Sequence, residues 1–280
     1  MNVAMIDDRM LPTDELDKAY LDRGLYFGDG VYEVLRSYDG RIFALDEHLA
    51  RFERSLKEIL IVGVDMAAVR QRIESAFAES GYPNAKIYFH ITRGSEPRSH
   101  LPGEGLRPNF MLTVEALGDD DPAKRQGVGV WTHPDWRWKR CDIKSLNLLP
   151  NVLARIAVQD KGASEAILVD EAGRITEGAG SAFFAVDGSE KILMTRPLGP
   201  EILPSITRAI VTQIAQNIGL TVVQKAQRPA QAAACDELFL AVTTKDIVPI
   251  TRFEGRPVGN GNVGEVTGKL MAEFAAFVRK

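Results

Sequence analysis

Several features that would place a protein in a specialised class are scarce in this sequence. Only two residues are cysteines, Cys141 and Cys235, which are too few for a disulfide framework and lack the spacing of a zinc or redox pair. No apolar run approaches the length of a membrane span, and the start, MNVAMIDDRM, is too acidic for a signal peptide. We therefore expect a cytoplasmic protein without disulfide bonds or a membrane partner.

Positive charge and metal-binding motifs are also missing. The 34 basic and 38 acidic residues leave a net charge of −4, and the basic residues are dispersed, so nucleic acid is not an expected partner. The histidines show no H-E-x-x-H or paired spacing, and we expect no metal site. A G-x-G-x-x-G match at 259–264 lies too close to the end for a dinucleotide-binding unit, and no G-x-S-x-G elbow occurs.

The 280 residues, 45% of them apolar, exceed what one core usually holds, so two lobes are expected. Apolar residues at spacings of three and four predict amphipathic helices over 45–59 and 66–77. These helices should cover one face of a sheet in a first lobe, residues 1–118, and the polar stretch LGDDDPAKRQG predicts a linker over 119–127. Strands are predicted in this lobe at 2–6, 31–38, 42–45, 85–93 and 108–116.

A second lobe is expected over residues 128–280. Its many short strands and few helices predict a barrel-like architecture, so the chain as a whole belongs to the α+β class. The predicted strands lie near 128–133, 165–169, 181–186, 191–195, 221–225 and 237–243, and the predicted helices at 150–161, 205–218 and 264–279.

Lys144 stands just ahead of apolar residues in the stretch DIKSLNLLPNVLAR. Such a lysine can extend its methylenes along apolar surface and keep its ammonium in water. It can also be a buried amine with a chemical role, because burial among leucines disfavours the charged form of a lysine. The sequence around Lys144 alone leaves both interpretations open.

Six stretches in one order decide between them. The chain resembles the fold-type IV pyridoxal-phosphate (PLP) enzymes, which include branched-chain aminotransferases, D-amino-acid aminotransferases and aminodeoxychorismate lyases. The resemblance implies a two-domain fold with a smaller N-terminal α/β sandwich lobe, a larger C-terminal pseudo-barrel lobe and PLP as cofactor. The stretches are RGLYFGDGVYEVLRSYDGRIFALDEHLARF (23–52), ITRGSEPRSH (91–100), DIKSLNLLPNVLA (142–154), ITEGAGSAFF (175–184), ILPSITR (202–208) and VTTKDIVPI (242–250).

The resemblance implies a role for individual residues of the cofactor site. Lys144 matches the lysine that joins the cofactor covalently and then carries a proton. Glu177 matches the acid beside the ring nitrogen, which keeps that nitrogen protonated. Arg51 matches the phosphate arginine and could bind two oxygens at once. The remaining expected cofactor ligands are Ser181, Ile206 and Thr207 at the start of the 205–218 helix, and Thr243.

The same resemblance implies how substrate is held and which reaction follows. Tyr32, Arg98 and His100 match the carboxylate trap of D-amino-acid aminotransferases, and Thr244 is a further expected substrate contact. The family delivers the Arg-x-His loop from the neighbouring subunit, which implies a homodimer. We therefore expect the amino group of a D-amino acid such as D-alanine to pass to a 2-oxo acid such as 2-oxoglutarate. A branched-chain L-amino-acid aminotransferase and an aminodeoxychorismate lyase are the alternatives.

Three positions bear on this assignment. Leu149 stands where branched-chain enzymes tend to carry tyrosine, which favours the D-amino-acid enzymes. Ala182 replaces a common family asparagine, and Arg196 replaces a usually apolar residue. Loss of the asparagine amide is expected to loosen the cofactor's surroundings or move a loop, without removing the residues expected to do the chemistry.

Overall fold

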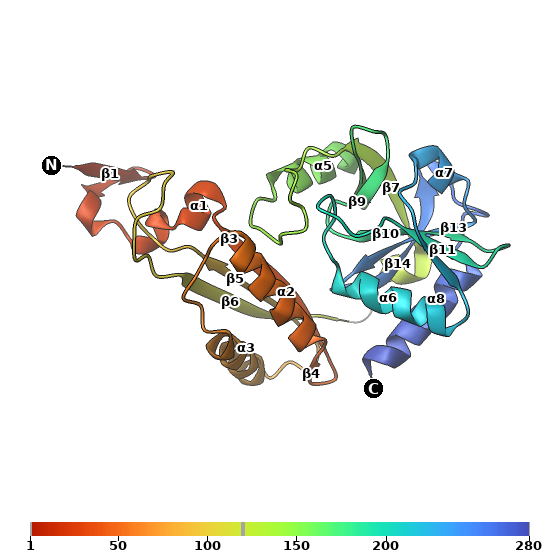
Figure 1. The fold of residues 1–280 in the computed structure, drawn as a ribbon, viewed down its shortest axis with the longest axis horizontal. Helices are drawn as coiled ribbons and strands as arrows, with labels where there is room; N and C mark the ends of the chain where they lie inside the picture. Colours follow the sequence, from red (N-terminus) through yellow and green to blue (C-terminus); the bar gives the residue numbers. More distant parts are fainter. Residues whose placement is uncertain (1, 119–120, 280) are drawn as a thin grey trace.

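The computed structural model describes residues 2–118 and 121–279 of the chain. The first half contains a hairpin, three α-helices and a four-stranded sheet (Figure 1). In chain order these elements are β1 (Val3–Ile6), β2 (Arg9–Pro12), the 3-10 helices η1 (Thr13–Glu15) and η2 (Lys18–Leu21), α1 (Arg23–Phe27), β3 (Gly30–Tyr38), β4 (Arg41–Ile42), α2 (Leu45–Glu58), α3 (Met66–Ser80), β5 (Ala85–Thr92) and β6 (Asn109–Ala116).

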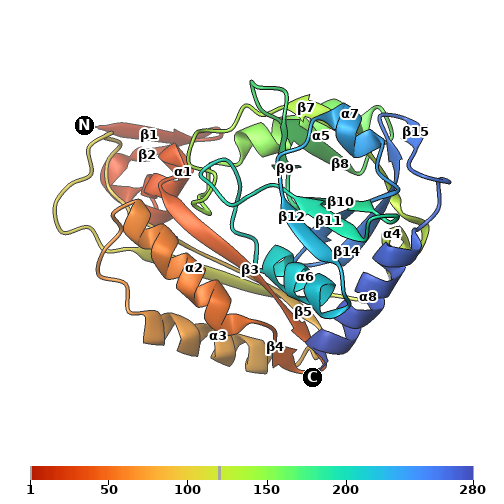
Figure 2. The ribbon, with the colours of Figure 1, turned by 45° about the vertical axis from the view of Figure 1, so that its right-hand side comes forward.

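The four-stranded sheet has the order β4-β3-β5-β6 and is antiparallel throughout. Alternate residues of β3 and β5 point into a core against α2 and α3, which cover one face of the sheet in both views (Figures 1 and 2). Leu35, Phe52, Ile73, Ile87 and Phe89 are completely buried there. The predicted sheet with helices on one face is confirmed.

The second half is built on one nine-stranded sheet, whose main path has the order β12-β11-β10-β13-β14-β7-β8-β9, with β15 paired to β14. The sheet curls like part of a barrel. Within the described residues its end strands β9 and β12 do not pair with each other, so this barrel is open. The elements are α4 (Pro122–Gln126), β7 (Val128–Pro134), α5 (Leu149–Gln159), β8 (Glu165–Val169), β9 (Ile175–Gly178), β10 (Ala182–Asp187), β11 (Ile192–Thr195), α6 (Ile206–Asn217), β12 (Thr221–Gln224), α7 (Pro229–Ala233), β13 (Glu237–Val242), β14 (Asp246–Phe253), β15 (Arg256–Pro257) and α8 (Glu265–Val278).

Helices α6 and α8 lie side by side against one face of this sheet (Figure 2). Their apolar stripes enclose Phe184 and Phe239, whose rings stack with centroids 4.8 Å apart. A second cluster, which includes Ile167 and Leu238, fills the other side of the sheet. The predicted α+β class and the barrel-like second lobe are therefore confirmed.

Some predicted elements differ from the structure. The predicted strand 42–45 is wrong beyond Ile42, because Ala44 adopts a left-handed conformation (φ 52°) and α2 begins at the next residue. Strands β2, β9, β14 and β15 were not predicted, and β14 contains Pro249, a residue that usually argues against a central strand. The predicted linker contains helix α4, while its residues 119 and 120 lie outside the described part. Among the helices described, none combines the length and apolar character needed to cross a membrane.

Candidate active site

The segment that carries Lys144 is attached to the other half of the molecule. It lies between β7 and α5, and its backbone pairs with β3: Tyr32 donates its N–H to the Lys144 carbonyl, and Leu146 donates to the Gly30 carbonyl, both at 3.0 Å. The amine of Lys144 lies 4.3 Å from the centre of the Tyr32 ring. The lysine is therefore held at the junction of the two sheets.

The leucines near Lys144 are placed differently from one another. Leu149 is 67% exposed and lies outside the cavity lining, whereas Leu148, 36% exposed, lines the same cavity as Lys144, and Leu146 is half-buried. The chain turns here toward α5, because Leu148 donates its N–H to the Leu146 carbonyl. The half-buried Lys144 itself faces Tyr32 and the cavity.

That cavity is open to solvent, and together with the solvent space at its mouth it has a volume of about 780 Å³. It lies between the two sheets, since its lining comes from β3 and α2 on one side and from β9, β10 and the β13–β14 turn on the other. It brings together six of the predicted site residues, which are Tyr32, Arg51, Lys144, Glu177, Ser181 and Thr243.

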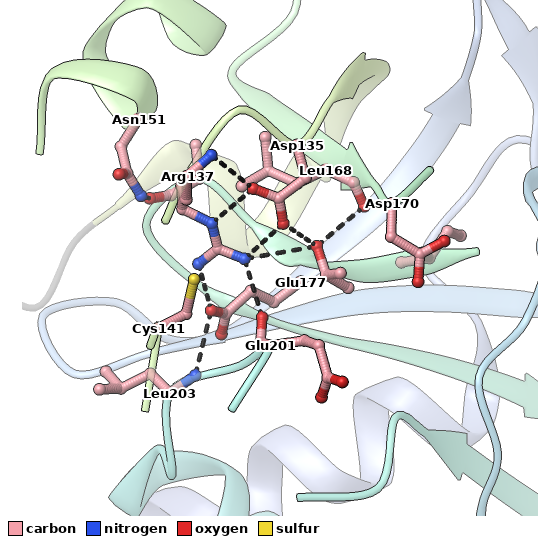
Figure 3. A network of polar contacts seen from close by, with 12 residues as sticks. Asp135, Arg137, Cys141, Asn151, Leu168, Asp170, Glu177, Glu201 and Leu203 are labelled. Atoms are coloured by element: carbon pink, nitrogen blue, oxygen red, sulfur yellow. Dashed lines mark hydrogen bonds and ion pairs between the residues drawn. The ribbon is translucent and has the colours of Figure 1, made fainter. Parts of the chain in front are cut away.

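Glu177 lies on β9 and is held by an arginine that the sequence did not reveal. Arg137 donates to its Oε1 at 2.5 Å, and the Leu203 N–H donates to the same oxygen at 3.1 Å (Figure 3). Arg137 is in turn fixed by Asp135 through Nε and Nη2. No described residue bonds to the second oxygen, Oε2, so it remains available to a partner in the cavity.

Burial and charge compete at this carboxylate. The side chain of Glu177 is only 8% exposed, and burial raises its pKa above the usual range, although the charge and hydrogen bond of Arg137 act in the opposite direction. Burial also opposes the charge on Arg137, but its two carboxylate partners raise its pKa. Arg137 therefore offsets part of the penalty that burial places on the ionised form of Glu177.

Arg51, on α2, is already hydrogen-bonded to a carboxylate of the protein itself. Its Nε and Nη2 donate to the two oxygens of Glu33 at 2.6 and 2.7 Å, and Nη1 donates to the Pro204 carbonyl at 2.9 Å. The planar fork expected to grip two phosphate oxygens is therefore already used, and only the outer hydrogens of Nη1 and Nη2 remain. The guanidinium still lines the cavity as a fixed positive charge.

Glu33 is completely buried and also accepts a hydrogen bond from Nδ1 of His48 at 2.8 Å. Burial alone would raise the pKa of Glu33, but Arg51 and His48 lower it to about 2. Burial lowers the pKa of His48, so a neutral imidazole donates to the carboxylate. Glu33, His48 and Arg51 form one buried group with a net charge near zero.

Helix α6 begins beside the cavity. Its N-cap is Ser205, whose hydroxyl accepts from the Arg208 N–H at 3.2 Å. The structure describes no acceptor for the N–H groups of Ile206 and Thr207, which belong to the first helical turn. The side chains of Ile206 and Thr207 do not line the cavity, whereas Leu203 and Ser205 do.

The other predicted ligands divide into two groups. Ser181 and Thr243 line the cavity, and the Ser181 hydroxyl donates to Glu165, a buried glutamate that the sequence did not reveal, at 3.2 Å. Thr244 lies outside the lining, and its carbonyl accepts from Arg36 of β3 at 3.0 Å. The β13–β14 turn is thus tied to the first sheet.

Arg98 and His100 are not brought into the cavity of their own chain. Both are exposed, and both lie against the ring of Phe27: the Arg98 guanidinium is 5.1 Å from its centre and the His100 ring 5.4 Å. Of the predicted carboxylate trap, only Tyr32 lines the same cavity as Lys144.

Ala182 and Arg196, the two residues that depart from the family pattern, both contact neighbouring strands. Ala182 is buried, lines the cavity and pairs with Ala241 across β10 and β13. Arg196 donates to Asp170 and to the Ile175 carbonyl, both at 2.9 Å. Because Ile175 begins β9, this arginine supports the strand that carries Glu177.

Sequence reasoning missed several residues that shape the site. One signal was available: Glu33 sits at an inward-facing position of an alternating strand, where a charge requires a buried partner. Arg137 gave no comparable signal, because its partner Glu177 is far away in the chain. The missed residues are Glu33, His48, Arg137, Asn151, Glu165 and Ser205.

The amine, the buried carboxylate and the guanidinium that line one cavity between the two sheets agree with the aminotransferase-type enzyme that the sequence resemblance implies. The model of the family "Amino-transferase class IV" matches residues 30–253, and the chain belongs to this family. A D-alanine aminotransferase of Bacillus licheniformis is 36% identical over 267 residues, covering 94% of this chain and 92% of the relative.

Solved structures agree with the family. A branched-chain amino acid aminotransferase of Thermoproteus uzoniensis with norvaline superposes with a TM-score of 0.83 at 26% identity, covering 97% of this chain and 93% of that one. A 4-amino-4-deoxychorismate lyase of Pseudomonas aeruginosa gives a TM-score of 0.80 at 27% identity, covering 95% and 96%. The resemblance to fold-type IV enzymes is confirmed.

Proposed function

We propose that this protein is a PLP-dependent D-amino-acid transaminase. It moves the amino group of a D-amino acid such as D-alanine to a 2-oxo acid such as 2-oxoglutarate in a ping-pong cycle. The observation that carries this proposal is the single cavity lined by Lys144, Glu177 and Arg51. The D-alanine aminotransferases among its relatives, which match nearly the full chain, support the choice of substrate.

The cavity fits PLP by the chemistry of its donors. Arg51 has one unused hydrogen on each of Nη1 and Nη2, and the hydroxyls of Thr243 and Ser205 line the same cavity, so these groups could donate hydrogen bonds to a phosphate. Oε2 of Glu177 is available to a ring nitrogen, and the Lys144 amine to an aldehyde. The cofactor, when bound, supplies a conjugated ring that takes up the electrons released when the substrate C–H bond breaks.

The residues of the chain supply the remaining chemistry. With PLP bound, the Lys144 amine would hold the cofactor aldehyde and would serve as the base that carries the proton of the substrate α-carbon. Glu177, which Arg137 holds in place, would accept a hydrogen bond from the protonated ring nitrogen. The Tyr32 ring lies against the lysine amine and limits the directions in which that amine can move.

A homodimer completes the site in this proposal. Arg98 and His100 are exposed and remote from their own cavity, as expected if they serve the cavity of a second copy. One face of α5 is also uncovered, and its apolar residues Leu149, Val152, Leu153 and Ile156 are 42–67% exposed. An exposed apolar stripe of this kind marks an interaction surface.

Two further expectations accompany this proposal. Residues 1–118 and 128–280 are proposed as the two domains, since each of the two large sheets lies within one of these ranges. We also propose that the protein acts in the cytoplasm, where its two free thiols are stable.

The decisive experiment compares three substrates on PLP-loaded protein. D-alanine with 2-oxoglutarate should yield pyruvate and D-glutamate, measured by chiral chromatography, while L-leucine and aminodeoxychorismate should react far more slowly. Conversion of L-leucine without conversion of D-alanine would favour the branched-chain alternative. Release of pyruvate from aminodeoxychorismate without an amino acceptor would favour the lyase. Lys144→Ala serves as the inactive control.

A further inference from the structure

The loop that carries Arg98 and His100 combines an exposed surface with a firmly held backbone. Residues 97–100 are all exposed, and a loop of this kind is ordinarily mobile. Here the carbonyl oxygens of Ser99 and His100 accept hydrogen bonds at 2.6 and 2.9 Å from one guanidinium. The backbone is thereby held on both sides of His100, beginning one residue after Arg98.

That guanidinium belongs to Arg23, the first residue of α1. Its side chain is only 4% exposed and uses all three nitrogens: Nε donates to Asp29 at 2.8 Å, Nη1 to Glu96 and to the Ser99 carbonyl, and Nη2 to the His100 carbonyl. These two carboxylate and two carbonyl partners take up four of the five N–H donors of the buried guanidinium. Arg23 therefore connects Asp29 to the loop that carries Arg98 and His100.

Phe27, the last residue of α1, holds the side chains as Arg23 holds the backbone. The guanidinium groups of Arg23 and Arg98 lie 4.9 and 5.1 Å from the centre of its ring, and the His100 ring lies 5.4 Å away. Cations favour the face of an aromatic ring, so the ring limits the directions available to Arg98. The two loop side chains thus share one platform.

Helix α1 itself is fixed on its other side. It has only five residues, too few to be stable alone, and its N-cap Asp22 binds the hydroxyl of Thr92 and the amide of Asn109. Its C-cap Gly28 is left-handed (φ 63°), and a Cβ there would lie 2.6 Å from Oδ1 of Asn147, three residues after Lys144. The helix is therefore a rigid base for the loop.

We propose that Arg23 and Phe27 are positioning residues that set the carboxylate-binding pair Arg98 and His100 for the cavity of a second copy. This proposal rests on the proposed function and deepens it by naming what determines carboxylate recognition. Neither residue touches the reacting atoms; both act through the geometry of the loop. Their loss should therefore weaken substrate binding while cofactor binding stays intact.

The first experiment measures KM and kcat for D-alanine in PLP-loaded variants. Arg23→Gln should raise KM by up to about 100-fold, because misplacing a binding group by about 1 Å costs that much. Arg23→Lys should not rescue KM, since an ammonium keeps the charge but cannot bridge both carbonyls. Phe27→Leu tests the same loop from the ring side, and remains informative if Arg23→Gln does not fold. The absorbance of the bound cofactor should match that of the unmodified protein throughout.

Arg93→Gln is the matched control. Arg93 binds the same Asp29 carboxylate through Nε and Nη2, but its other donors reach the carbonyls of Ile59 and Leu60 beside the end of α2. It should lose comparable stability without the rise in KM. An equal rise in KM for Arg93→Gln would show that general destabilisation is responsible and would overturn the proposal.

A second experiment tests whether the effect crosses to the other subunit. The Arg23→Gln protein keeps Lys144 but has an altered loop. The Lys144→Ala protein keeps the loop but lacks the lysine. The two proteins are unfolded and refolded together in equal amounts. Random pairing in a twofold dimer should then give about a quarter of the cavities both an unmodified Lys144 and an unmodified loop from the other subunit. A component with the unmodified KM should therefore appear in the mixture.

The outcomes separate the two proposals. If the unmodified protein converts D-alanine and Arg23→Gln keeps its KM, the positioning role is refuted while the transaminase assignment stands. If the mixture gains no component of low KM, the loop does not serve the second copy. If the unmodified protein does not convert D-alanine, both proposals fail.

Discussion

Glu33→Gln gives the sharpest test of the electrostatics beneath the cavity. The substitution keeps the shape of the side chain but removes the charge that Arg51 and His48 share. These partners lower the pKa of Glu33 to about 2, against 4.5 for an ordinary glutamate. At about 1.4 kcal/mol per pH unit, the ionised carboxylate contributes about 3 kcal/mol to stability at neutral pH.

The expected result has a sign and a pH dependence. A depressed carboxyl pKa stabilises the fold above about pH 4.5, and this contribution is lost as the pH falls toward 2. Glu33→Gln should lower the thermal midpoint by about 6 °C or more at pH 7.5, measured by calorimetry with excess PLP. The gap in stability should shrink by about 0.8 kcal/mol at pH 4 and about 2 kcal/mol at pH 3.

Glu115→Gln is the control. Glu115 lies on the same sheet and pairs with Lys86 at 2.8 Å, but its side chain is 58% exposed, so its loss should change stability by less than about 1 kcal/mol. A change of less than about 1 °C for Glu33→Gln, or a gap that grows as the pH falls, would refute the reasoning about the buried group.

Other consequences follow from the neighbouring groups. Arg137→Gln should raise the pKa of Glu177 further and move the acidic limb of the kcat profile to higher pH; an unmoved limb would show that Arg137 does not oppose protonation of this carboxylate. Ser205→Ala removes the α6 N-cap and should cost about 1 kcal/mol in the free energy of unfolding, measured by urea titration, whereas Ser205→Asp should restore it. Burial raises the pKa of Cys141 to about 11, so iodoacetamide at pH 8 should modify it about 100-fold more slowly than an ordinary thiol, followed by mass spectrometry; a fast reaction would contradict its burial.

The sequence predicted the elements whose pattern is local. Helices α2, α3, α6 and α8 show apolar stripes at spacings of three and four, and their bounds agree with the structure to within about three residues. Strand β9 has four residues, too few to display a period, and β14 contains Pro249. Such strands are defined by their neighbours in the sheet, which a sequence does not reveal.

The contrast between local patterns and contacts of distant elements also explains which site residues could be predicted. Lys144, Glu177 and Arg51 could be named because short motifs surround them, and all three line the cavity. Their partners could not, because the contacts of Arg137 with Glu177 and of Arg51 with Glu33 cross from one element to another. The structure adds that the arginine fork expected for phosphate is directed at a protein carboxylate.

The hydrogen bonds that attach the Lys144 segment to β3 imply that PLP, the cofactor form of vitamin B6, also stabilises the folded chain. The cavity lies between the two sheets and the Lys144 segment is bonded to β3, so PLP would bind the conformation in which the two sheets are in contact. By mass action, free vitamin at about 100 times its dissociation constant favours the docked state by about 2.7 kcal/mol. A cell short of vitamin B6 would therefore lose both the activity and part of the protection of this polypeptide against degradation.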